Sequence, residues 1–221
     1  MELKLTHPWV KTVAQAKAIQ EQLRSQVVSS DCLDNVNYVA GVDIGFKNNY
    51  TISQAAIAIL TYPTLELVEH KISQIPTAFP YVPGYLSFRE IPAILAVLPQ
   101  LEIIPDLILC DGQGLAHPRR LGLASHLGLL LDIPTIGVAK SLFIGKHEPV
   151  PTAKGSWQPL IDREETVGVA LRSRTNVKPI YVSVGHKISL PTAINYVMGC
   201  LTKYRLPETT RWADKLASDK T

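Results

Sequence analysis

Apolar residues recur at helical spacing in five stretches of the chain. In residues 8–28 they are spaced to fall on one helix face, which would carry Trp9, Val13, Ala16, Ile19, Leu23 and Val27. The same reading predicts helices over residues 87–99, 119–131, 191–203 and 208–217. Proline is tolerated in a first turn, so Pro191 and Pro207 mark helix starts, and Pro92 is expected near the first turn of its helix.

Runs rich in apolar and β-branched residues predict the strands. The first three lie close together and are joined by short polar or proline-containing links, which favours an antiparallel meander over residues 38–45, 51–62 and 65–74. Residues 106–111 and 134–139 flank a predicted helix, and a strand–helix–strand order indicates parallel pairing. Further strands are predicted over residues 166–172 and 180–184, whereas residues 145–165 are predicted to be mostly loop.

This order of elements is that of a ribonuclease H-like fold. It is an α/β architecture in which three antiparallel strands are followed by parallel strands, and helices flank the mixed sheet. The chain has 221 residues and shows no internal repeat. A single domain over residues 1–221 is the simplest prediction, with two small domains as the alternative.

Composition narrows the class of protein. Hydrophobic residues make up 46% of the chain and charged residues 19%, which excludes a disordered polymer. The net charge of +3 permits a nucleic-acid partner without requiring one. Three widely spaced cysteines give neither a disulfide framework nor a zinc pattern. With neither a signal peptide nor a long apolar run in the sequence, we expect a cytoplasmic protein that has no membrane partner.

Two aspartates stand out against apolar strands. Asp43 interrupts the run YVAGVDIGF, and Asp111 ends the strand DLILCD. Burying a lone carboxylate is costly, but a hard divalent cation would offset that cost. If the first and fourth strands are neighbours, both carboxylates would meet at one edge of the sheet and hold a metal ion. The alternatives are a capping or turn aspartate at Asp43 and a plain turn residue at Asp111.

Two further acids and two bases are weaker candidates. Glu90 opens a predicted helix, where the helix dipole alone would favour it, and Asp214 lies on the last helix, where a solvated charge is the ordinary reading. With Asp43 and Asp111 they would form a four-acid cluster suited to two-metal phosphodiester cleavage. His117 would orient water or protonate a leaving oxygen, unless it simply packs in its loop. Lys140 would contact phosphate, and His186 receives no assignment.

The segment PYVPGYLSFRE, residues 80–90, combines prolines, a glycine and aromatics. Pro80, Pro83 and Gly84 would stiffen a turn that presents Tyr81 and Tyr85. Rigid projecting aromatics suit stacking on bases or wedging into a duplex. The alternative is that these aromatics only cover the core.

Taken together, these segments resemble the endonuclease V family. The resemblance is spread over nearly the whole chain, and the second and third stretches are the most specific: VAGVDIGF (39–46), PYVPGYLSFRE (80–90), LILCDGQGLAHPRRLGLASHLG (107–128), IPTIGVAKSL (133–142), VSVGHKISLPTA (182–193) and LPETTRWADKL (206–216). It implies a magnesium-dependent DNA repair endonuclease, with Mn²⁺ as a substitute for Mg²⁺. Such an enzyme hydrolyses the second phosphodiester bond 3′ to deoxyinosine and other deaminated bases, and leaves 3′-hydroxyl and 5′-phosphate ends.

The resemblance also implies roles for residues. Asp43 and Asp111 match the family's metal-binding aspartates, and the remaining catalytic positions match Glu90, His117, Lys140 and Asp214. The DNA-binding wedge matches Tyr81, Pro83 and Gly84, with Val82 where isoleucine is frequent. The flipped base would enter a pocket lined by Leu86, Gly112, Gly114, Gly122 and Leu123, where glycines would let the backbone approach the base.

The partner implied is DNA that contains deoxyinosine, bound by a monomer. An endonuclease for inosine-containing RNA is one alternative, because the sequence offers no evident sensor of the 2′-hydroxyl. A non-catalytic nucleic-acid binder on the same fold is the other, although a full set of four acids argues against it.

Overall fold

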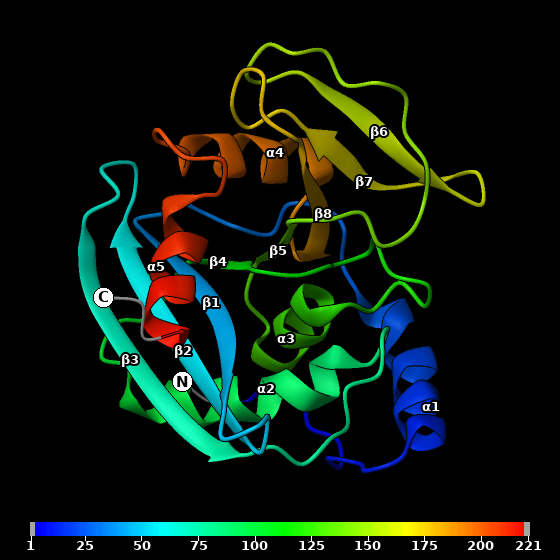
Figure 1. Ribbon diagram of the computed structural model, residues 1–221, viewed down its shortest axis with the longest axis vertical. Coiled ribbons are helices and arrows are strands. Elements are labelled where there is room, and N and C mark those ends of the chain that lie inside the picture. Colours follow the sequence, from blue (N-terminus) through cyan, green and yellow to red (C-terminus); the bar gives the residue numbers. More distant parts are fainter. Residues whose placement is uncertain (1–2, 219–221) are drawn as a thin grey trace.

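The computed structural model describes residues 3–218. Within this part of the chain, eight strands form one mixed sheet in the order β3-β2-β1-β4-β5-β8-β7-β6 (Figure 1). The strands are β1 (Tyr38–Lys47), β2 (Ile52–Thr61), β3 (Leu67–Pro76), β4 (Leu107–Cys110), β5 (Thr135–Ala139), β6 (Trp157–Asp162), β7 (Glu165–Leu171) and β8 (Ile180–His186). β1, β2 and β3 form the predicted antiparallel meander, and β4 runs parallel to both β1 and β5. The predicted ribonuclease H-like fold class is confirmed.

Helices cover both faces of this sheet. They are α1 (Val13–Leu23), α2 (Leu86–Val97), α3 (Leu123–Leu131), α4 (Leu190–Gly199) and α5 (Glu208–Ala217). Side chains alternate across a strand, so Leu107 and Leu109 of β4 join the core that contains α4, while Ile108 joins the core that contains α2 and α3. Across the described residues, none of the helices combines the length and the apolar character needed to cross a bilayer.

Several predicted boundaries differ from the structure. The first helix spans Val13–Leu23 rather than residues 8–28, because Thr12 caps its start and a short 3₁₀ turn, Arg24–Gln26, follows. Trp9 lies outside this helix and contacts the rings of Phe88 and His126. The helix predicted from residue 119 begins only at Leu123, because Arg120 adopts a left-handed backbone conformation.

Two other expectations missed a detail. Residues 145–165 are mostly loop, as predicted, but they also contain β6, which pairs with β7 at the edge of the sheet. Pro92 lies well inside α2, which begins at Leu86, rather than near the first turn. The helix tolerates this proline even though it supplies no backbone N–H donor.

Candidate active site

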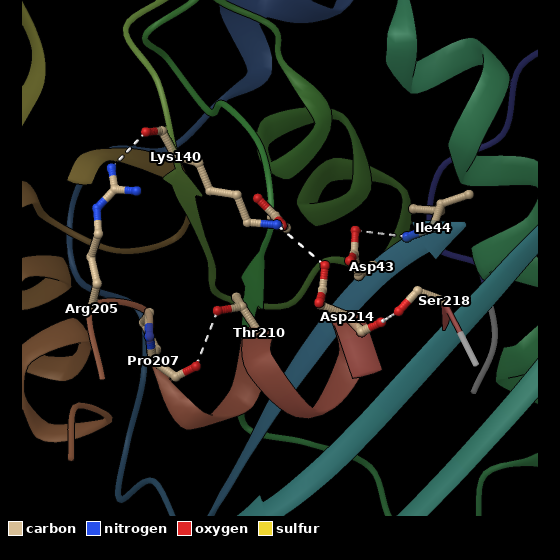
Figure 2. A network of polar contacts seen from close by, with 9 residues as sticks. Asp43, Ile44, Lys140, Arg205, Pro207, Thr210, Asp214 and Ser218 are labelled. Carbon is tan, nitrogen blue, oxygen red and sulfur yellow. Dashed lines mark hydrogen bonds and ion pairs between the residues drawn. The ribbon is translucent and has the colours of Figure 1, made fainter. Parts of the chain in front are cut away.

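Three carboxylates meet where β1, β4 and α5 come together. Asp43 lies on β1, Asp111 directly follows β4, and Asp214 lies on α5. One oxygen from each of these residues falls within 4.8 Å of the other two. Figure 2 shows Asp43 and Asp214 facing each other from strand and helix. The structure thus brings together three of the four acids that the sequence singled out.

Strand pairing explains the first two members of this cluster. β1 and β4 are parallel neighbours in which Val42 is paired with Cys110, and the Asp111 N–H donates to the Val42 carbonyl at 3.2 Å. The residues that follow, Asp43 and Asp111, therefore lie side by side. By the alternation of side chains they share the face of the sheet that α5 covers.

Two glycines bring α5 close enough to supply the third acid. A Cβ on Gly41 would lie 2.0 Å from the Thr209 carbonyl oxygen, and one on Gly45 would lie 2.1 Å from the Ala217 carbonyl oxygen. The backbone of α5 therefore rests directly on β1, with Asp214 between these two points of contact. The side-chain amide of Gln54 on β2 fixes the end of the helix by donating to the Ala217 carbonyl at 3.0 Å.

Lys140 supplies positive charge to the cluster. Its Nζ forms an ion pair with Asp111 and lies 3.4 Å from Oδ1 of Asp214. The lysine follows β5, and its backbone carbonyl accepts a hydrogen bond from Arg205 Nη2 at 2.6 Å (Figure 2). Arg205 also donates to the Pro179 carbonyl at 2.7 Å, so it ties the ends of two strands together beside the acids.

Burial and the charges of neighbouring acids raise the pKa of two of these carboxyl groups, Asp43 and Asp111. Burial, followed by the charge of Asp111, raises the pKa of Asp43 to about 7, although the Ile44 N–H and Lys140 oppose the shift. Burial also raises the pKa of Asp111, with Lys140 opposing and Asp214 adding to the effect. Lys140 offsets only part of the negative charge. Clustered carboxylates that resist ionisation are a donor set that a hard divalent cation fits.

Glu90 approaches the cluster from α2 on the other side of the sheet. It is not one of the three closely clustered acids, but it lines the cavity next to Asp111. Burial, followed by the charges of Asp43 and Asp111, raises the pKa of Glu90 to about 8. Its carboxyl group therefore carries a proton near neutral pH when no cation is bound.

A cavity of about 370 Å³ opens beside Asp111. The lining combines predicted catalytic, wedge and pocket residues: Glu90, Asp111, His117, Lys140, Tyr81, Pro83, Gly84, Leu86, Gly112, Gly122 and Leu123. Sequence reasoning missed Gln113, Ser141, Leu142 and Phe143, which also line it. The side chains of Leu142 and Phe143 are 44% and 40% exposed. In the sequence, two apolar residues that follow the candidate lysine after a single serine are the signal that could have found Leu142 and Phe143.

The glycines of this region differ in what they allow. Gly114 is not among the residues that line the cavity, because it packs against β8, where a Cβ would lie 2.0 Å from the Val184 carbonyl oxygen. A Cβ on Gly122 would lie 2.3 Å from the Gln113 carbonyl oxygen. Both positions therefore need glycine for internal packing. A Cβ on Gly112 would meet only the Leu123 side chain, at 3.3 Å, so this glycine alone of the three widens the cavity.

His117 is buried and neutral. Its Nδ1 accepts the Arg119 N–H at 3.2 Å, so the proton resides on Nε2, which lies 3.0 Å from the Gly84 carbonyl oxygen. Burial, followed by the charge of Arg119, lowers the pKa of His117 to about 4. Both ring nitrogens are thus engaged by the protein, and the imidazole holds the loop that contains Gly84.

The two remaining residues of interest differ in their surroundings. Tyr81 is 69% exposed at the rim of the cavity, as a wedge residue would have to be. His186 is buried elsewhere, where its Nδ1 accepts the Val28 N–H at 3.2 Å and its Nε2 lies 3.6 Å from Asp132. His186 therefore ties the segment after α1 to β8, and the cavity lining does not include it.

The sheet topology and the three gathered carboxylates place the chain in the class of ribonuclease H-like proteins with an acidic centre. A structure with only 17% sequence identity, that of A. aeolicus Argonaute, shares this fold with a TM-score of 0.55. The sequence profile described as Endonuclease V matches residues 21–215, and the chain belongs to the endonuclease V family.

Relatives support this membership over the full length of the chain. Endonuclease V from Rippkaea orientalis is 68% identical over 220 residues, covering 100% of this chain and 96% of that protein. The Streptomyces avermitilis endonuclease V structure is 42% identical with a TM-score of 0.91, covering 99% and 97% of the two chains. A Ciona intestinalis endonuclease V, bound to a 23mer DNA containing an inosine followed by a ribo-adenosine, is 34% identical with a TM-score of 0.84, covering 94% and 96%.

Proposed function

We propose that this chain is a DNA repair endonuclease that hydrolyses the second phosphodiester bond 3′ to deoxyinosine, leaving 3′-hydroxyl and 5′-phosphate ends. The observation that carries the proposal is the junction of an acid cluster with a cavity whose rim bears an exposed tyrosine. The three carboxylates all come from one chain, which supports a single catalytic domain that acts as a monomer.

Asp43, Asp111 and Asp214 would hold Mg²⁺, with Mn²⁺ as a substitute. When bound, such a cation supplies positive charge to the scissile phosphate and promotes ionisation of the attacking water. Lys140 orients two of these acids through its ion pairs and presents an ammonium to the phosphate backbone. Glu90, which holds a proton near neutral pH in the cation-free site, lies close enough to exchange that proton with groups inside the cavity.

The cavity would receive the base once it has left the helical stack. Its volume lies within the range of about 300–1,000 Å³ that is typical of ligand pockets. Leu86 and Leu123 give it apolar walls, while Gly112 leaves space for a planar ring. Extruding a base costs a few kcal/mol, and Tyr81 would recover part of that cost by stacking in the vacated space.

Cleavage of a labelled oligonucleotide with a single inosine tests the proposal. Duplex DNA, single-stranded DNA and RNA of one sequence are compared in magnesium and in EDTA, with guanosine in place of inosine as the control. We expect a magnesium-dependent nick at the second phosphodiester bond 3′ to the inosine, and only in DNA that contains inosine. Cleavage restricted to RNA would establish the endoribonuclease alternative, and tight binding without cleavage would establish the non-catalytic one.

A further inference from the structure

The carbonyl oxygen of Gly84 accepts three hydrogen bonds. Gln20 Nε2 donates at 3.0 Å, His117 Nε2 at 3.0 Å, and Arg119 Nη2 at 2.7 Å. A carbonyl oxygen has two lone pairs, so two donors would satisfy it, and this oxygen has one donor more than it needs. Gly84 ends the segment of residues 80–84 that carries Tyr81, and the three donors therefore fix one end of that segment.

Gln20 is the least expected of these donors. It belongs to α1, a mostly exposed helix, yet its own side chain is fully buried. Its Oε1 accepts from Arg119 Nε, and its Nε2 also reaches the Leu121 carbonyl at 3.3 Å. A buried amide is stable only when its polar atoms are paired, and here both are paired with the two loops that form the rim of the cavity.

Other contacts restrain the residues around Tyr81. Gly84 has a φ of +83°, a left-handed conformation that disfavours any replacement. The Arg119 guanidinium stacks on the Tyr85 ring, with 4.2 Å between its Cζ and the ring centroid. Val82 packs against a small core that includes Ala16 of α1. Tyr81 thus projects into solvent from a segment whose neighbouring residues are anchored.

We propose that Gln20 is a positioning residue for substrate recognition, because it holds residues 80–84 in the conformation that presents Tyr81 to duplex DNA. Helix α1 is then part of the recognition apparatus, although it contributes nothing to the cavity lining. The inference rests on the proposed function. Its physical basis is preorganisation: a segment that is already rigid loses less conformational entropy when it enters the duplex.

Two substitutions separate the contacts of Gln20. Gln20→Met keeps the side-chain volume and removes every hydrogen bond, whereas Gln20→Glu keeps the acceptor for Arg119 and removes the donor to Gly84. Gln22→Met is the matched control, because Gln22 is exposed on the same helix. The measurement is the single-turnover cleavage rate on an inosine duplex and on the same inosine strand alone, both in magnesium.

We expect both Gln20 variants to lose on the order of tenfold on the duplex, the effect of losing the buried hydrogen bond to Gly84 that both variants lack, and clearly less on the single strand. Gln22→Met should match the wild type on both substrates. In a Tyr81→Ala background, Gln20→Met should cause no further loss specific to the duplex, because the two residues act through one segment.

Equal losses on duplex and single strand would overturn the inference and leave Gln20 with a structural role only, as would wild-type rates in both variants. A wild type that cleaves neither substrate would instead contradict the proposed function. If Gln20→Met melts below the assay temperature, Arg119→Lys provides the same comparison, because lysine keeps the charge but cannot bridge Gln20 and Gly84.

Discussion

Burial and the charges of Asp111 and Asp214 raise the pKa of Asp43, and burial and the charge of Asp214 raise the pKa of Asp111. In the cation-free protein, the raised pKa of Asp43, about 7, means that the folded chain keeps a proton that the unfolded chain releases near its ordinary pKa of 3.8. The stabilising contribution of this group is present below that ordinary value and is lost as pH rises through about 7. These side chains are therefore positioned for a ligand at some cost in stability.

We predict that Asp43→Asn abolishes cleavage without weakening the fold. The amide keeps the oxygen that accepts the Ile44 N–H but loses the charge that a cation requires. The cleavage rate should fall by about 10³ or more, given what metal ions contribute to such reactions. In EDTA near pH 8, its melting temperature should equal or exceed that of the wild type. Turnover within a few-fold of wild type would contradict the metal assignment, and exposed Asp34→Asn is the control.

His117 gives a pH dependence of the opposite sign. Its folded pKa of about 4 is below the ordinary 6.5, so the stability it contributes is present above 6.5 and is lost as pH falls toward 4. Glutamine offers an amide donor in place of Nε2–H and does not titrate. We therefore predict that His117→Gln is less stable than the wild type at neutral pH, and that this difference in stability narrows as the pH falls. Melting temperatures of both proteins between about pH 7.5 and 4.5 test this. A deficit that stays constant or grows would show that His117 is not held neutral.

At the scale of elements, the contact of α5 with β1 decides whether the acid cluster forms. Gly41→Ala would place a methyl group against the Thr209 carbonyl and push the helix away from the strand. We predict that this substitution lowers the free energy of unfolding by roughly 1–3 kcal/mol or more, because 1–3 kcal/mol is the usual penalty of overpacking. Cleavage should also require more magnesium, because Asp214 withdraws from Asp43. Urea unfolding and a magnesium titration measure the two effects, with Val68→Ala on the exposed face of β3 as control.

An unchanged magnesium requirement in Gly41→Ala would show that the spacing of α5 does not set metal affinity. The same contact explains why sequence reasoning found Asp214 only weakly. Asp214 lies on a helix where a solvated charge is the default, and nothing local records that glycines of a distant strand draw the helix onto the sheet.

Most strands could be predicted because buried strands are apolar along their length. β6 could not, since WQPLID is partly exposed and contains Pro159, a residue that sheets accept only at an edge. α1 was predicted too long for a related reason. Its flanking apolar residues are extended chain that packs elsewhere, and helical spacing alone cannot separate these two cases.

The site could be predicted to the extent that its residues violate a local rule. Asp43 and Asp111 are charges on apolar strands, and Tyr81 is an aromatic on a stiff turn, so each is visible in the sequence. Gln20 breaks no rule, because a glutamine on an exposed helix is ordinary. Its positioning role is evident only from its burial against the carbonyl of Gly84, which is distant in sequence, and that burial depends on tertiary packing.

At the scale of the whole molecule, ligand binding and folding should be linked. A cation that binds the folded cluster and not the unfolded chain stabilises the protein by about 2.7 kcal/mol at 100 times its Kd. For a chain of this size we predict a rise of roughly 5–10 °C in melting temperature on adding saturating magnesium to metal-free protein. Asp43→Asn should show a much smaller rise. Identical shifts in the two proteins would indicate binding somewhere other than the cluster.

The position of Asp214 on α5 also has a consequence during synthesis. The ribosome releases β1 and β4 well before α5, so a partly made chain carries Asp43 and Asp111 but lacks the third carboxylate. The cluster is completed only when α5 docks on a sheet that has already formed. A nuclease synthesised in this order would be inactive as a nascent chain, so nucleic acid near the ribosome would be exposed to cleavage only by completed molecules.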